Sequence, residues 1–355
     1  MTHPLSPSRP SRVAFAGTPD DSVPALRALA GAEFEIPVVV TGTPRRRSRR
    51  GSETPSPVGA AAADLGLKVS HDPADLAGCG ADCAVVVAFG QLIAAEMLAV
   101  TPMLNLHFSL LPRWRGAAPV ERALLAGDSR TGVSLMALEP TLDTGPVYWQ
   151  HEVTIGPADT AAGLRERLAS EGATCLAASL AEGLPAPQPQ EGTPTYARKL
   201  TPEDRRIDWS QPAAFIDRQI RVGGAWTTLK GQRFIIRAAR PADSPPDAAH
   251  DTPPESAAVH DAASRVAVAH DAALQTCNNK KGDGHAASRV AVAHDAALRS
   301  AAARDFPPGT LAGDAVVVTP DGLIHLEIVQ PAGRGAIDAQ AWLRGARLPD
   351  GARFG

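Results

Sequence analysis

Two polar side chains that can act on a carbonyl group stand two residues apart near the middle of the chain, at Asn105 and His107. On an extended strand both project from the same face, because alternate side chains point to the same side. Asn105 carries an amide that can donate a hydrogen bond to an oxygen. His107 carries the side chain best suited to proton transfer near neutral pH. The pair is therefore typical of a site where an oxyanion forms.

A carboxylate follows later in the chain, at Asp143 in the run Leu142-Asp143-Thr144-Gly145. We expect a turn here, in which Gly145 permits unusual backbone angles. If the fold brings Asp143 beside His107, the three side chains form a site for attack on a carbonyl. The chemistry indicated is transfer of an acyl-like group.

Composition limits the classes of protein that the chain can belong to. Its 355 residues have room for two domains, and 44% hydrophobic residues support ordinary cores. The net charge of −3 excludes a general attraction to nucleic acid, so RNA contacts must come from local basic patches. No apolar run of about 18 residues predicts a membrane span. The four cysteines lack the paired spacing of a metal site and favour free thiols, so we expect a cytoplasmic protein without a metal.

The first half alternates short apolar runs with helical patterns, which predicts an α/β fold with a mostly parallel, Rossmann-like sheet. Thr18 and Pro19 are expected to start the first helix. Ligands of such sheets bind at the carboxyl ends of strands, and Asn105 and His107 fall near one such end. Strands are expected at residues 13–16, 38–40, 84–89, 105–108 and 132–138, and helices at residues 119–125 and 160–184.

A proline-rich run at residues 185–190 begins a linker, and the pattern beyond it is rich in β-structure. Hairpins are expected at residues 227–237 and 316–329, with a helix at 337–343, so that the strands close into a small OB-like barrel. Residues 262–274 recur letter for letter at 286–298, within a low-complexity segment that we interpret as an insert. The expected division is a flexible N-terminus (1–11), a catalytic domain (12–184), a linker (185–206) and a C-terminal barrel (207–355) containing the insert (241–304).

Two basic patches could contact RNA. The first contributes five guanidinium groups to one loop, from Arg45, Arg46, Arg47, Arg49 and Arg50. Arginines can bind phosphates in a bidentate manner and stack on unpaired bases, although such a run can also be an ordinary solvated loop. The second patch, residues 198–240, holds ten basic residues against four acidic ones. A positive channel between the domains would suit an RNA arm.

Taken in order, these motifs resemble the folate-dependent formyltransferases. The resemblance starts from Asn105-x-His107-x-Ser109-Leu110-Leu111-Pro112-x-x-Arg115-Gly116, followed by the run that contains Asp143. It covers residues 12 to about 237 and 307–345 and leaves the insert outside. Further matching pieces lie at residues 15–19, 54–58, 113–119, 196–200 and 207–209.

The resemblance implies transfer of a formyl group from 10-formyltetrahydrofolate to an amine, with Asn105, His107 and Asp143 as the catalytic residues. The fuller set of motifs resembles that of the members that act on the methionine of initiator tRNA. The arginine loop and the barrel would bind this tRNA. Asp143 would hold the imidazole so that His107 can donate a proton to the leaving nitrogen. Phe108 replaces an expected small residue and predicts a narrower folate pocket. The residues implied at the folate site are Ser109, Leu110, Leu111, Pro112, Ala88, Phe89 and Gly90.

Three other functions compete with this interpretation. A formyltransferase acting on an amino sugar or on glycinamide ribonucleotide would need the same three side chains. A non-catalytic RNA-binding protein on the same scaffold would not need them. A dehydrogenase is disfavoured because Gly17 does not complete the glycine fingerprint of a dinucleotide site. We expect a monomer that binds tRNA and folate, without DNA or membrane partners.

Overall fold

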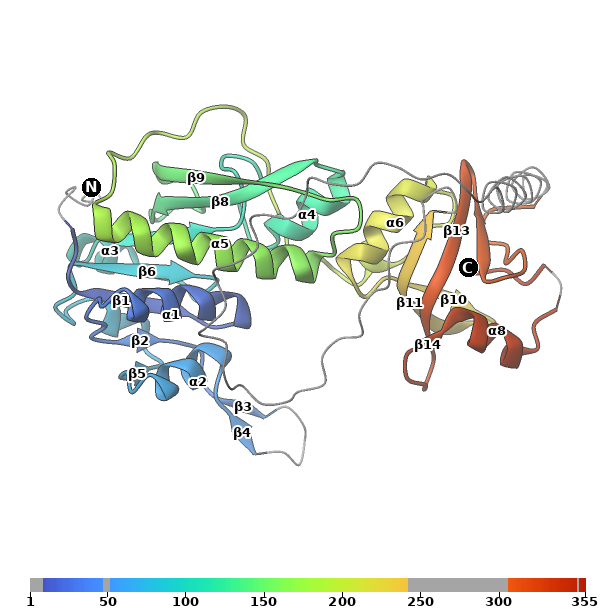
Figure 1. Ribbon diagram of the computed structural model, residues 1–355, viewed down its shortest axis with the longest axis horizontal. Helices are drawn as coiled ribbons and strands as arrows, with labels where there is room; N and C mark the ends of the chain where they lie inside the picture. Colours follow the sequence, from blue (N-terminus) through green and yellow to red (C-terminus); the bar gives the residue numbers. More distant parts are fainter. Residues whose placement is uncertain (1–8, 47–51, 242–305, 350) are drawn as a thin grey trace, which may run out of the picture.

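The N-terminal half folds around a seven-stranded sheet with the strand order β5-β2-β1-β6-β7-β8-β9 (Figure 1). The computed structural model describes residues 9–46, 52–241, 306–349 and 351–355. Five neighbouring strands run parallel, which confirms the expected mostly parallel sheet: β5 (Val69–Ser70), β2 (Val39–Val40), β1 (Val13–Gly17), β6 (Cys83–Val87) and β7 (Met103–His107). The last two strands, β8 (Arg130–Ala137) and β9 (Val147–Thr154), run antiparallel to their neighbours.

Both faces of this sheet are covered, and the alternation of side chains decides what each face contacts. Val13 and Phe15 of β1 pack into the main core, whereas Ala14 and Ala16 pack into a second core on the other face. The main core contains side chains of α1 (Val23–Gly31), α2 (Pro57–Asp64), α4 (Pro119–Ala126) and α5 (Ala161–Glu182). The second core contains those of the 3-10 helix η2 (Pro73–Leu76) and of α3 (Ala95–Val100).

Two helices have well-formed caps, and the first helix begins later than expected. Thr160 caps α5 by accepting a hydrogen bond from the Gly163 amide, and Gly127 ends α4 in the left-handed conformation. The expected start at Thr18 and Pro19 is wrong. The chain first makes a 3-10 turn, η1 (Asp20–Ser22), and α1 begins only afterwards. The Thr18 hydroxyl instead donates to the Phe89 carbonyl at 3.1 Å, so it ties β1 to the segment after β6 rather than capping a helix.

The second domain is a small antiparallel barrel, as expected. Its strands follow the order β10-β11-β13-β12, and the C-terminal residues close the remaining gap through backbone hydrogen bonds. The Thr228 amide donates to the Gly355 carbonyl, Leu311 donates to Ala352, and Val318 donates to Thr310. The strands are β10 (Trp226–Leu229), β11 (Gln232–Pro241), β12 (Val316–Thr319), β13 (Gly322–Pro331) and β14 (Ile337–Asp338).

Two helices and a cluster of rings complete the barrel. Helix α6 (Ala213–Val222) packs on β11, and α8 (Ala339–Ala346) packs on β13. Asp338 caps α8, and the helix begins two residues later than expected because Ile337 and Asp338 pair with β13. In the barrel core Phe234 contacts the rings of Trp342 and Phe354, and Phe354 stacks on Trp209.

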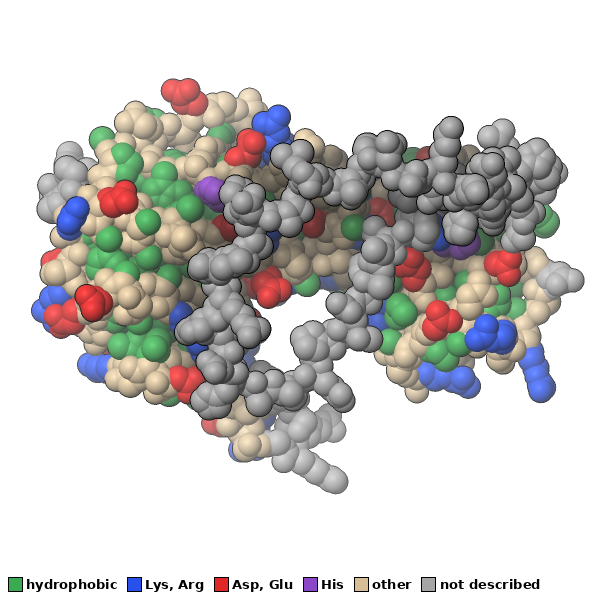
Figure 2. Space-filling model, viewed as in Figure 1, with side chains coloured by type: hydrophobic (Ala, Val, Ile, Leu, Met, Phe, Trp, Pro, Cys, Tyr) green, Lys and Arg blue, Asp and Glu red, His purple; other side chains and the backbone are tan. Residues whose placement is uncertain are grey.

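The domains meet where α4 and α5 of the first contact α6 of the second. Leu124, Ala161 and Val222 form a small buried cluster there. Beside it, Arg122 forms an ion pair with Asp204 at 3.1 Å. In Figure 2 the two domains lie side by side.

Three expectations concern other parts of the chain. No helix in the described ranges is long and apolar enough to cross a membrane. Within the same ranges Cys79, Cys83 and Cys175 are free thiols, as expected. Cys83 lies fully buried in β6, and burial raises its pKa to about 12. Cys277 and residues 242–304 of the expected insert lie outside the described residues.

Candidate active site

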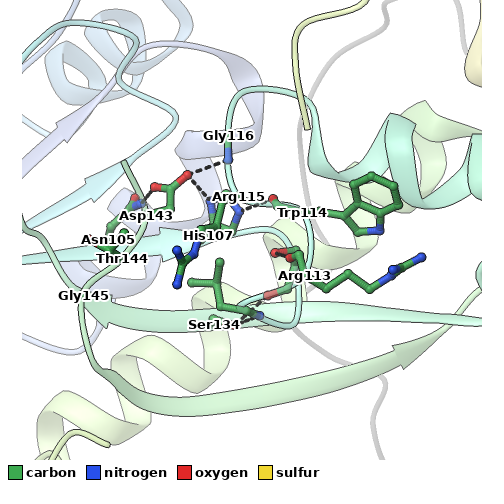
Figure 3. A network of polar contacts seen from close by, with 12 residues as sticks. Asn105, His107, Arg113, Trp114, Arg115, Gly116, Ser134, Asp143, Thr144 and Gly145 are labelled. Atoms are coloured by element: carbon green, nitrogen blue, oxygen red, sulfur yellow. Dashed lines mark hydrogen bonds and ion pairs between the residues drawn. The ribbon is translucent and has the colours of Figure 1, made fainter. Parts of the chain in front are cut away.

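The structure brings Asn105, His107 and Asp143 together at the edge of the sheet (Figure 3). The side chains of Asn105 and His107 lie on the same face of β7, and both approach the carboxylate of Asp143. Asn105 Nδ2 donates to Asp143 Oδ1 at 3.4 Å, and His107 Nδ1 lies 3.8 Å from Asp143 Oδ2. His107 and Asp143 are 7% and 8% exposed, so their interaction is largely shielded from water. The carboxylate thus links two side chains that can stabilise charge on a reacting oxygen.

The imidazole is held on its other side by the backbone. His107 Nε2 lies 3.0 Å from the carbonyl oxygen of Trp114, which can only accept a hydrogen bond. Nε2 must therefore carry the hydrogen in this contact, while Nδ1 faces the carboxylate. Trp114 presents its carbonyl from a left-handed conformation, with φ +62°.

The turn that carries Asp143 differs from the expected one. Gly145 was expected to adopt the unusual backbone angles, but Asp143 itself lies in the left-handed region, with φ +50°. Gly145 is needed for space instead, because a Cβ there would overlap the carbonyl oxygen of Ala137. The backbone amide of Gly116 donates to Asp143 Oδ2 at 2.7 Å and fixes the direction of the carboxylate.

The linker after α5 returns to this site, which the sequence did not predict. Gln190 donates to the carbonyls of Asp143 and Gly145, and Arg115 donates to Gln190. Farther along, Ala197 exchanges backbone hydrogen bonds with the segment that contains Arg115. A polar glutamine within a proline-rich run was the available signal, but no spacing rule connects it to Asp143.

Comparison with known proteins shows the family of this chain. The family model described as "Formyl transferase" matches residues 11–180, and the one described as "Formyl transferase, C-terminal domain" matches residues 199–286. The methionyl-tRNA formyltransferase of Acidothermus cellulolyticus is 41% identical over 362 residues, covering 97% of this chain and 99% of the relative. The chain belongs to the methionyl-tRNA formyltransferase family.

A second relative agrees with this assignment, and a solved structure shares the fold. The methionyl-tRNA formyltransferase of Jannaschia sp. is 36% identical over 357 residues, covering 96% of this chain and 98% of the relative. The crystal structure of HypX from Aquifex aeolicus in complex with tetrahydrofolic acid shares the fold, with a TM-score of 0.53 at 15% identity. That match covers 95% of this chain and 47% of HypX.

Within this family fold, residues 109–112 form a tight loop directly after β7. Ser109 is fully buried, and its hydroxyl donates to the Arg113 carbonyl at 2.6 Å. Ser134 of β8 donates to the Ser109 carbonyl and accepts from the Leu111 amide. Leu111 is buried, whereas Leu110 and Pro112 are half-buried. Hydrogen bonds to Ser134 of β8 thus hold this loop against the sheet.

The other residues expected at the folate site follow β6, next to β7 in the sheet. Ala88 and Gly90 are exposed in left-handed conformations, with φ +43° and +72°, whereas Phe89 is buried. Phe108 is 8% exposed and belongs to the main core together with Leu106. Its side chain therefore packs on helices rather than beside His107, which lies on the other face of β7.

The first basic patch is only partly described. Arg45 and Arg46 form β3 (Arg45–Arg46), which pairs with β4 (Glu53–Thr54) in a hairpin that projects beyond α2 (Figure 1). Both arginines are exposed. Arg47, Arg49 and Arg50 lie outside the described residues. No group of three or more His, Cys, Asp or Glu residues within the described ranges is placed to hold a metal ion.

The second basic patch divides into two groups. Arg205, Arg218, Arg221 and Arg240 are half-buried, and the first three donate to backbone carbonyls. Arg240 forms an ion pair with Glu327. Arg205 and Arg240 thus make contacts within the second domain. Arg218 and Arg221 instead donate to the Leu125 and Asp159 carbonyls of the first domain, across the junction. The exposed members are Arg198, Lys199, Arg206, Lys230, Arg233 and Arg237.

Proposed function

We propose that this protein transfers the formyl group of 10-formyltetrahydrofolate to the free amino group of methionyl initiator tRNA and so supports translation initiation. The observation that carries the proposal is the convergence of Asn105 and His107 on Asp143, in a chain similar to methionyl-tRNA formyltransferases along almost its whole length. HypX, which shares the fold, binds tetrahydrofolic acid.

The site residues take the following roles in this reaction. The neutral amine of the methionyl group attacks the formyl carbon, and the carbonyl oxygen becomes an oxyanion. Asn105 Nδ2 carries two hydrogens and uses one toward Asp143, so the second is available to the oxyanion. Asp143 orients His107, which serves in proton transfer.

The balance of the reaction is simple. The new bond joins the amine nitrogen to the formyl carbon, and the bond from that carbon to N10 of the folate breaks. The amine loses one proton and N10 gains one, so the products are a formamide and tetrahydrofolate. His107 is the group that can pass this proton. No oxidant, reductant or metal is required.

The remaining assignments belong to the same proposal. Residues 12–184 act as the catalytic domain, 185–206 as the linker and 207–355 as a tRNA-binding barrel that contains the insert 241–304. Residues 109–112 and 88–90 shape the folate site, and the arginines of residues 45–50 contact the tRNA. The protein acts as a monomer in the cytoplasm. Binding of a polyanion should weaken steeply with salt.

The decisive experiment supplies the purified protein with 10-formyltetrahydrofolate and three amines: charged initiator methionyl-tRNA, charged elongator methionyl-tRNA and glycinamide ribonucleotide. We expect rapid formylation of the initiator tRNA alone. Transfer to glycinamide ribonucleotide with none to tRNA would overturn the substrate and leave the three catalytic side chains in place. Tight tRNA binding without transfer to any amine would favour a non-catalytic RNA-binding protein.

A further inference from the structure

Gln190 uses every hydrogen-bonding position of its side chain. Its Nε2 donates to the carbonyl oxygens of Asp143 at 2.9 Å and of Gly145 at 2.8 Å. Its Oε1 accepts from Arg115 Nε at 3.1 Å and from Arg115 Nη2 at 2.7 Å. An amide offers two donors and two acceptor positions, so this side chain is fully satisfied and fixed in one orientation.

The two carbonyls that Gln190 binds lie on either side of Thr144, in the turn that presents the carboxylate. Asp143 adopts a left-handed conformation, which is unfavourable for a residue with a Cβ, so its surroundings must hold it there. Gly145 packs against the Ala137 carbonyl and cannot move toward it. The side-chain amide of Gln190 therefore stabilises the backbone of this turn through the Asp143 and Gly145 carbonyls.

Arg115 connects this arrangement to the other restraint on Asp143. The amide of the next residue, Gly116, donates directly to Asp143 Oδ2. Arg115 thus belongs to a segment that holds the carboxylate through Gly116 and holds its backbone through Gln190. The same segment is fastened to the linker, since the Arg115 amide donates to the Thr195 carbonyl at 2.8 Å.

We infer that Gln190 is a positioning residue for formyl transfer: it fixes the turn of Asp143 so that the carboxylate faces His107 and Asn105. This inference rests on the proposed function. Gln190 acts through Asp143 and has no role at the reacting atoms. The linker thereby takes part in building the site, besides joining it to the barrel.

Glutamate is the most informative replacement, because it keeps the size of the side chain and its ability to accept from Arg115. It removes both donors to the Asp143 and Gly145 carbonyls. Displacements of about 1 Å at a catalytic group can reduce rates by about 100-fold. We expect Gln190→Glu and Gln190→Ala each to lower kcat by about 10- to 100-fold, with KM for both substrates within about twofold.

Gln188 provides a matched control in the same run of the chain. Its exposed side chain donates only to the carbonyl of Ala186, two residues away, at 3.2 Å. Gln188→Ala should leave kcat unchanged. If Gln190→Ala does not fold, Gln190→Glu still tests the inference, because its shape is that of the native residue. Circular dichroism and the thermal midpoint establish that each variant compared is folded.

A double-mutant cycle distinguishes positioning from a general effect on stability. In an Asp143→Asn background, the further change Gln190→Glu should reduce kcat by less than about twofold, since the group that Gln190 positions is already lost. A full 10-fold loss in that background would overturn the inference, as would a kcat unchanged by Gln190→Glu alone. An increase in KM without loss of kcat would also overturn it.

The wild-type reaction separates failure of this inference from failure of the proposed function. If wild-type protein does not formylate initiator methionyl-tRNA, the proposed function fails before any variant is compared. If wild-type protein is active and Gln190→Glu equals it in kcat, the function stands and only the positioning role is excluded.

Discussion

The backbone amide of Gly116 donates to Asp143 Oδ2 at 2.7 Å, so the main chain as well as the Asn105 side chain fixes the direction of the carboxylate. Gly116 can do this only as glycine. Its φ is +118°, and a Cβ would lie 2.9 Å from the Ala197 carbonyl oxygen. The Arg115-Gly116 motif thus has a physical reason: it permits close approach of the linker on one side while restraining Asp143 on the other.

Replacement of either His107 or Asp143 should abolish most of the turnover. We expect His107→Ala and Asp143→Asn each to lower kcat by at least about 100-fold, because each removes the proton carrier or the group that orients it. Binding of tRNA should be nearly unchanged, since both side chains are buried. Steady-state formylation and filter binding measure the two effects. Unchanged turnover in either variant would remove that residue from the mechanism.

Gly145→Ala should destabilise the protein, although it adds only a methyl group. The new Cβ would overlap the Ala137 carbonyl, and neither backbone can move without disturbing β8. Overpacking of this kind costs about 1–3 kcal/mol. The thermal midpoint measures the effect, and Gly31→Ala is the control because nothing lies within 4 Å of its added Cβ. Equal midpoints for the two variants would contradict this account of the turn.

The sequence predicted the part of the site that strand geometry determines. The spacing of Asn105 and His107 places both on one face of β7, and the alternation of apolar runs predicts the parallel sheet. Contacts between distant segments were beyond such rules. Nothing local indicates that Gln190 returns to Asp143, or that Gly355 closes the barrel beside Thr228. The sequence likewise predicted the left-handed conformation at Gly145, whereas Asp143 adopts it. A glycine can be needed for its backbone angles or for lack of space, and a sequence does not distinguish the two reasons.

The stability of the folded protein should decrease in acid because of Asp204, which lies at the domain junction. Burial opposes its ionisation, but the hydrogen bond from the Thr201 amide and the guanidinium groups of Arg198 and Arg122 outweigh burial and hold its pKa well below the ordinary value. A group with a lowered pKa stabilises the folded state above its unfolded pKa of about 3.9, and that stabilisation is lost as the pH falls.

Asp204→Asn tests this dependence. We expect the variant to be less stable than wild type by about 1–3 kcal/mol at pH 7. The difference should shrink below about pH 4, because Asp204 of the unfolded wild-type chain then binds a proton that the folded protein still lacks. Thermal midpoints across this range provide the measurement. Asp64→Asn, at the exposed end of α2, is the control and should change the stability little. A pH-independent difference for Asp204→Asn would show that packing alone accounts for its role.

Neutralising the described part of the arginine hairpin should weaken use of tRNA without harming the fold. Arg45 and Arg46 are exposed, and the contact of Arg46 with Glu53 at 3.7 Å is an exposed pair that contributes little to stability. In the double variant Arg45→Gln/Arg46→Gln, we expect a higher KM for tRNA and little change in kcat. Each lost phosphate contact should flatten the log–log salt dependence of binding by about 0.7–0.9. Arg27→Gln, on the exposed face of α1, is the matched control and should change neither quantity. A higher KM for the folate with unchanged use of tRNA would instead show that the hairpin supports the folate site, because the polyanion would then have no contact with these arginines.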